Sequence, residues 1–125
     1  MSRKIFLSYA SEDKQHLEGI KELLEHHRIT KQGENVSFID PMSESFNPGA
    51  SIRELIKKQI ESSSDVVVFA TEDSLSSQWV NYEIGMADAL NKPIVVVGRK
   101  GFGKTSLLQS LEGVRLIEID MKANN

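Results

Sequence analysis

The chain contains no cysteine, only three prolines and one tryptophan in 125 residues, and no long hydrophobic run. Without cysteine it forms no disulfide, and a structural zinc site with thiolate ligands is not expected. Its longest apolar stretches, such as residues 66–70 and 94–97, are far shorter than the roughly 20 residues that span a bilayer. No apolar segment of the signal-peptide type follows the basic start at Arg3 and Lys4. We therefore expect a soluble, cytoplasmic protein that has no membrane partner.

An excess of charge of either sign is also missing. Fifteen basic residues stand against eighteen acidic ones, which gives a net charge of -3. Such a chain has no overall field that attracts nucleic acid or an anionic membrane, so nucleic acid is not an expected partner. At this length one core can bury roughly two thirds of the surface that the unfolded chain exposes. We expect a single domain over residues 1–121 and a short C-terminal tail over residues 122–125.

Short apolar runs alternate with segments of helical periodicity along the whole chain. The apolar runs predict strands at residues 4–9, 35–40, 65–70, 94–97 and 114–119. The periodic segments predict helices at residues 11–27, from the Ser51 capping box onward, at 78–91 and at 105–111. Several strands are apolar throughout, as in a parallel sheet that is covered on both faces. The right-handed crossover rule then favours an α/β, flavodoxin-like, doubly wound sheet of order 2-1-3-4-5.

This topology predicts the place of a functional site before any motif is considered. Ligands of open parallel sheets bind at the carboxyl ends of the strands where the strand order reverses. Here that point lies between the strands at 4–9 and 65–70, next to the loops at 8–13 and 71–77. The loop at 41–50 is close enough to act as a flap.

Several common functions of such sheets lack their residues. The acidic pair, the aspartate and the lysine that a phosphoacceptor receiver domain needs are not in place, and Glu12 and Asp13 would repel a flavin phosphate. The G-x-S-x-G motif of α/β hydrolases does not occur. His26 and His27 are adjacent, so on a helix they point about 100° apart and cannot bind one metal ion together.

Residues 98–105 (GRKGFGKT) match the phosphate-binding pattern G-x-x-x-x-G-K-[ST]. Only residues 106–125 follow, which is too little chain for the rest of a nucleotidase core. We interpret the segment as a glycine-rich surface turn, with nucleotide binding there as the alternative.

Trp79 and Glu83 are four residues apart, so a helix places them on one face, as an apolar surface beside a carboxylate. This pair lies at the edge of the predicted crevice. The plain alternative is that Trp79 packs in the core and Glu83 is solvated.

Four segments in the right order and spacing resemble the Toll/interleukin-1 receptor (TIR) domain family. They are residues 4–13 (KIFLSYASED), 38–40 (FID), the Pro48-Gly49 pair and 77–83 (SQWVNYE), the last resembling the segment with the family's catalytic glutamate. The Phe-Trp box of receptor-type members is absent, so the chain is more similar to the bacterial, enzymatic branch.

The resemblance implies cleavage of the bond between nicotinamide and ribose in NAD+, with Glu83 as the catalytic residue and with no metal or additional cofactor. It implies substrate contacts from Ser8, Tyr9, Asp40, Trp79 and Tyr82. It further implies TIR–TIR self-association, in which Pro48 and Gly49 take part, and an ADP-ribose-derived signal to a separate effector in bacterial antiviral defence. Hydrolysis, cyclisation and base exchange stay open, and the main alternative is a non-catalytic TIR–TIR adaptor.

Overall fold

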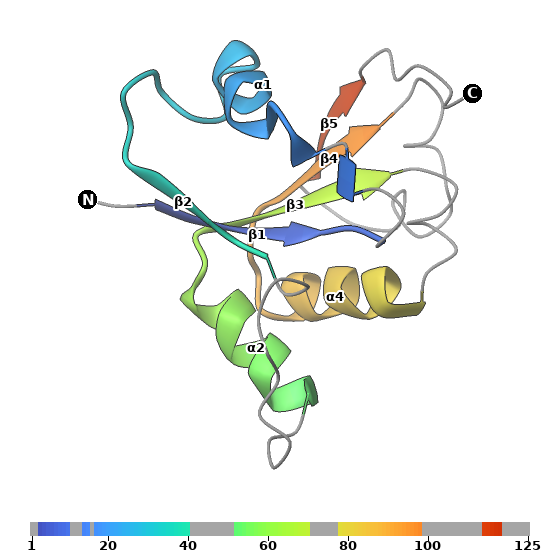
Figure 1. Cartoon of the computed structure of the whole chain (residues 1–125). Helices are drawn as coiled ribbons and strands as arrows, with labels where there is room; N and C mark the ends of the chain where they lie inside the picture. Colours follow the sequence, from blue (N-terminus) through green and yellow to red (C-terminus); the bar gives the residue numbers. More distant parts are fainter. Residues whose placement is uncertain are drawn as a thin grey trace.

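The computed structural model describes residues 3–10, 14–15, 17–40, 52–70, 78–98 and 114–118. Within these ranges the chain forms a parallel, five-stranded sheet of order β2-β1-β3-β4-β5 (Figure 1). The strands are β1 (Arg3–Ser8), β2 (Val36–Ile39), β3 (Asp65–Ala70), β4 (Ile94–Gly98) and β5 (Arg115–Glu118). The strand order and the flavodoxin-like fold predicted from the sequence are confirmed.

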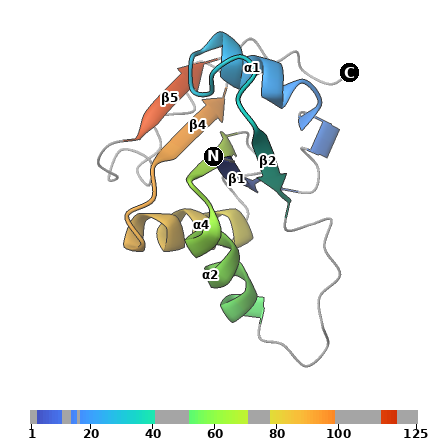
Figure 2. The same ribbon diagram turned by 90° about the vertical axis from the view of Figure 1, so that its left-hand side faces the viewer.

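Helices cover both faces of this sheet. Helix α1 (Ile20–His26) lies on one face, and α2 (Ile52–Ser62) and α4 (Gln78–Ala89) lie together on the other (Figures 1 and 2). The predicted helix at 78–91 is confirmed to within two residues. The helices predicted from Ser51 and at 105–111 differ in outcome: the first begins at Ile52 in the structure, and the second lies outside the described residues.

The prediction of one helix over residues 11–27 is wrong in its first part. Gly19 adopts a left-handed conformation with φ of 80°, and α1 begins only at the next residue, Ile20. Before that point Leu17 belongs to a short 3₁₀ turn and packs at the edge of the core. The apolar spacing correctly marks the residues that pack in or against the core, but a glycine that takes positive φ ends an α-helix wherever it stands.

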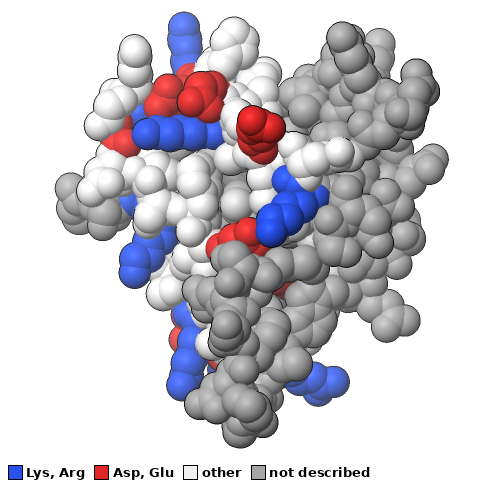
Figure 3. Space-filling model, viewed as in Figure 1, with Lys and Arg blue, Asp and Glu red and all other residues white. Residues whose placement is uncertain are grey.

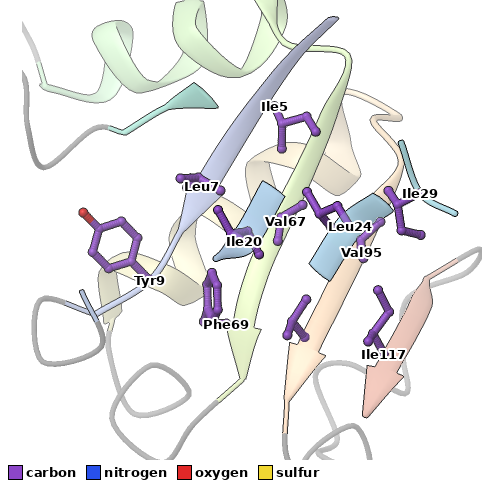
Figure 4. Close-up of a cluster of buried hydrophobic side chains, with 11 residues drawn as sticks. Ile5, Leu7, Tyr9, Ile20, Leu24, Ile29, Val67, Phe69, Val95 and Ile117 are labelled. Carbon is purple, nitrogen blue, oxygen red and sulfur yellow. The ribbon is translucent and has the colours of Figure 1, made fainter. Parts of the chain in front are cut away.

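Alternation along the strands divides the core into two layers. On the face of α2 and α4, Phe6, Val66, Val68, Ile94 and Val96 pack against Ile56, Ile60, Val80, Ile84 and Ala87. On the face of α1, a second cluster contains Ile5, Leu7, Tyr9, Ile20, Leu24, Ile29, Val67, Phe69, Val95, Val97 and Ile117 (Figure 4). Because successive side chains point to opposite faces, Ser8 follows Phe6 toward α4 and Tyr9 follows Leu7 toward α1.

At the amino ends of the strands, Arg3 joins three segments. Its guanidinium donates from Nε to Oδ1 and from Nη2 to Oδ2 of Asp65, both at 2.8 Å, and from Nη1 to the carbonyl of Ile29 at 2.7 Å. Such a two-point contact between arginine and a carboxylate fixes orientation as well as distance. It holds the start of β1 against the start of β3 and so sets the register that brings their carboxyl ends together.

The surface carries charges of both signs. On the face seen in Figure 3, Lys and Arg side chains are interleaved with Asp and Glu side chains over the described residues. None of the helices in the described ranges has the length and hydropathy needed to cross a membrane.

Candidate functional site

Three of the predicted site residues lie at the carboxyl ends of β1 and β2, and a fourth lies on a helix beside them. Ser8 is the last residue of β1, Tyr9 follows it, and Asp40 follows β2. Glu83 comes from α4, which packs on the face toward which Ser8 points. Because β1 lies between β2 and β3, this is the point at which the strand order reverses.

The hydroxyl of Ser8 donates a hydrogen bond to Oε1 of Glu83 at 3.0 Å. Neither residue has exposed surface: both are 0% accessible. The second carboxyl oxygen, Oε2, is also buried and has no hydrogen-bond partner in the part of the chain that the structure describes. Buried polar atoms almost always have a partner, because leaving one without costs free energy. At the reversal of the strand order, this oxygen is a hydrogen-bonding atom that a bound group could contact.

A second hydroxyl–carboxylate pair lies next to the first. The hydroxyl of Tyr9 donates to Oδ1 of Asp40 at 2.6 Å, while the tyrosine ring is buried with Leu7 and Ile20. Figure 4 shows the hydroxyl at the end of the ring that points away from this cluster. Burial, the hydrogen bond to Asp40 and the charges of Asp40 and Glu83 all raise the pKa of Tyr9 above its usual value. The phenol therefore stays a neutral donor at physiological pH.

The carboxyl of Glu83 is strongly perturbed. Its pKa is raised from 4.5 to about 8, mainly by burial; the hydrogen bond from Ser8 lowers the pKa and the charge of Asp40 raises it. At neutral pH the carboxyl therefore carries a proton. A cation placed beside it would favour the ionised form and lower the pKa. The pair of Glu83 and Asp40 is thus better suited to a positively charged group than to an anion.

The remaining predicted residues are not all brought to this place. Tyr82 is half-buried and packs against the apolar cluster between the sheet and the α2–α4 layer. Trp79 lies in the first turn of α4, but its side chain is outside the described residues. Pro48, Gly49 and the loop at 41–50 are outside them as well, and so is the phosphate-loop-like segment beyond Gly98, the last residue of β4.

The full burial of Glu83 was not foreseen, and the alternative of a solvated Glu83 is wrong. The spacing of the apolar residues along this helix could have predicted that burial. Val80, Ile84 and Ala87 are all 0% accessible, and residue 83 falls in the same stripe, because positions i, i+3, i+4 and i+7 share one helical face. A carboxyl within such a stripe is a buried carboxyl.

The described residues contain no group of three or more His, Cys, Asp or Glu side chains that could hold a metal ion. His26 is exposed at the end of α1, and its ring meets that of His27 edge-on at a centroid distance of 5.1 Å.

The fold and the site define an α/β domain with a buried, proton-bearing glutamate where the strand order reverses. The family model described as the TIR domain matches residues 5–124. The chain therefore belongs to the TIR domain family, as the sequence motifs indicated.

Solved structures share this fold. The CMP N-glycosidase BcmB of Clostridium botulinum is 20% identical with a TM-score of 0.61, over 95% of this chain and 91% of that one. The TIR domains of the activated Roq1 resistosome are 22% identical with a TM-score of 0.52, over 78% of this chain and 58% of theirs. A 2-deoxyribosyltransferase from Leishmania mexicana is 15% identical with a TM-score of 0.52, over 78% of this chain and 65% of that one. No curated protein matches the sequence.

Proposed function

We propose that this TIR domain cleaves the N-glycosidic bond between nicotinamide and ribose in NAD+, with Glu83 as the catalytic carboxylate. The observation that carries the proposal is the buried carboxyl of Glu83, whose Oε2 has no partner among the described residues, at the strand-order reversal. Two proteins with a similar fold are named as a CMP N-glycosidase and a 2-deoxyribosyltransferase, names that refer to an N-glycosidic bond and to the transfer of a deoxyribosyl group. Their likeness supports a proposal of the same bond type here.

The chemistry of NAD+ fits one carboxylate. Ordinary glycosidases need two carboxyl groups, because an alkoxide leaving group has to be protonated. Nicotinamide leaves as a neutral base from a cationic pyridinium, so no general acid is needed. The remaining task is to stabilise the positive charge that develops on the ribose, and an ionised carboxylate in a buried site does this well.

The raised pKa of Glu83 links binding to ionisation. With its pKa at about 8, the carboxyl of the free protein is mostly protonated at pH 7. The pyridinium charge of NAD+ lowers this pKa, so substrate binding releases a proton and produces the ionised form that the reaction needs. For NAD+, the apparent KM should therefore fall as the pH rises toward 8.

Glu83 has no accessible surface, so substrate reaches it only after neighbouring groups move. We propose that TIR–TIR self-association produces this change, with an ADP-ribose-derived product that signals to a separate effector in bacterial antiviral defence. On this proposal the dilute chain is slow and the assembled chain is active.

The test is to incubate the pure protein with NAD+, both dilute and under conditions in which light scattering confirms assembly, and to identify products by mass spectrometry. Glu83→Gln should lower the rate of the assembled protein by a factor of about 100 or more. Asp88→Asn, an exposed change on the same helix, is the matched control and should keep the rate. Equal turnover by the Glu83→Gln assembly would refute the assignment, and assembly without any turnover would favour the adaptor.

A second candidate is cleavage of a pyrimidine nucleotide, whose base is uncharged, as the likeness to the CMP N-glycosidase suggests. The favouring observation is the proton on Glu83, because a neutral base leaves more easily when it is protonated. The two candidates predict opposite pH dependences. Cleavage of NAD+ rises as Glu83 ionises, whereas cleavage of CMP falls as the pH passes about 8.

A further inference from the structure

We propose that Ser8 is a positioning residue for Glu83: its hydroxyl holds Oε1 and leaves Oε2 as the oxygen that meets the reacting ribose carbon. The inference rests on the proposed function and deepens it. It gives Ser8 a role different from the substrate contact that the family resemblance implies.

The donor is fixed by the sheet. Ser8 is paired in register with Val68 of β3, so it lies within the sheet and not on a free loop. Its side chain has no accessible surface, and its hydroxyl is 3.0 Å from Oε1 of Glu83. A serine hydroxyl has a single proton to donate. With that proton directed to Glu83, Ser8 has no donor left for a substrate.

The two carboxyl oxygens of the acceptor, Glu83, differ in their hydrogen bonds. Oε1 accepts from Ser8, whereas Oε2 is buried and has no hydrogen-bond partner within the described ranges. A carboxyl held at one oxygen cannot swing without breaking that bond, so the direction of the other oxygen is set. Side chains that take part in chemistry need this kind of support, because small misplacements cost large factors in rate.

The other groups that act on Glu83 do not replace this support. Among the described residues, Asp40 raises the pKa of the carboxyl through its charge, and the hydroxyl of Tyr9 is directed to Asp40. Val66 and Val68 of β3 and Ile56 and Ile60 of α2 supply apolar surface to the same layer. Ser8 is therefore the described group that both orients Glu83 and favours its ionised form.

The test compares Ser8→Ala with Ser63→Ala. Each change removes one buried serine hydroxyl, but that of Ser63 donates to the carbonyl of Ile60 at the end of α2, away from the site. The first readout needs no turnover: the carboxyl carbon of Glu83 is titrated by NMR in ¹³C-labelled protein, with Glu83→Gln to assign the signal. Removing the Ser8 hydrogen bond should raise the pKa of Glu83 by about one, because hydrogen bonds to charged groups are strong. Ser63→Ala should leave the titration unchanged.

The second readout is the kinetics of NAD+ cleavage by the assembled protein. For Ser8→Ala we expect kcat to fall between about 10-fold and 100-fold while KM changes less than about threefold. The acid limb of the pH profile of kcat/KM should move upward together with the NMR titration. Ser63→Ala should keep both kinetic constants and the profile.

Each result decides a different point. An unchanged Glu83 titration in Ser8→Ala overturns the positioning role, whatever the kinetics show. A raised KM with unchanged kcat also overturns it and returns Ser8 to the substrate contacts. A shifted titration in a protein whose wild-type assembly cleaves no NAD+ refutes the proposed function, yet it keeps Ser8 as the residue that orients Glu83.

Discussion

Replacing Glu83 by glutamine should make the protein more stable, and increasingly so as the pH rises. The folded protein keeps the Glu83 proton until about pH 8, whereas the unfolded chain releases it near pH 4.5. Between these two values ionisation favours the unfolded chain, so the wild-type protein loses stability as the pH rises. Glutamine is nearly isosteric and stays neutral, so the variant does not suffer this loss.

The magnitude follows from the difference in pKa. Each pH unit between 4.5 and 8 is equivalent to about 1.4 kcal/mol. Relative to wild type, Glu83→Gln should therefore gain little at pH 4, about 3 kcal/mol at pH 7 and about 5 kcal/mol above pH 8. In a chain of this length, the gain at pH 7 should raise Tm by about 10 °C.

Urea denaturation followed by circular dichroism at pH values from 5 to 9 measures this difference directly. Asp88→Asn, which removes an exposed carboxyl from the same helix, is the control and should show no such slope. The reasoning is refuted if the gain from Glu83→Gln is independent of pH, or if the wild-type protein becomes more stable relative to the variant from pH 5 to pH 8.

Two further predictions concern the scaffold. Arg3→Met should lower the free energy of unfolding by about 2–3 kcal/mol, because it leaves the largely buried carboxyl of Asp65 without its two-point partner. Lys57→Met, which breaks an exposed ion pair, should change it by less than about 1 kcal/mol, and equal losses in urea denaturation would contradict the argument. Gly19→Ala should cost about 1 kcal/mol, because the space is open but φ is +80°. A gain in Tm for that variant would show that the left-handed turn is not required.

The order of the sheet could be predicted because several sequence signals agreed. Apolar runs such as residues 66–70 and 94–97 marked buried parallel strands, and the crossover rule left few topologies. The start of α1 could not be predicted in the same way, because apolar spacing continues through Gly19 and does not reveal its backbone conformation. Periodicity reports which side chains share a face, and it does not report where the helical hydrogen bonds begin.

For the site as well, the sequence pattern predicted which residues lie close together but not which atoms form hydrogen bonds. The sequence placed Ser8 and Glu83 near one another, because the strand order reverses between β1 and β3. It could not show that the Ser8 hydroxyl donates a hydrogen bond to Oε1 of Glu83, since this contact depends on how α4 packs against the sheet. The pair of Tyr9 and Asp40 likewise depends on the register of β1 and β2, in which Phe6 lies opposite Ile39.

The burial of Glu83 also bears on the choice between an enzyme and an adaptor. A protein of this size is stable by about 5–15 kcal/mol, so a carboxyl that costs about 3 kcal/mol at pH 7 removes a substantial part of that margin. An apolar side chain at position 83 would complete the stripe of Val80, Ile84 and Ala87 without this loss. An adaptor acts through its surface, where a fully buried Glu83 contributes no contact. A group that weakens the fold and is hidden from partners is better explained by chemistry at the carboxyl ends of the strands than by assembly alone.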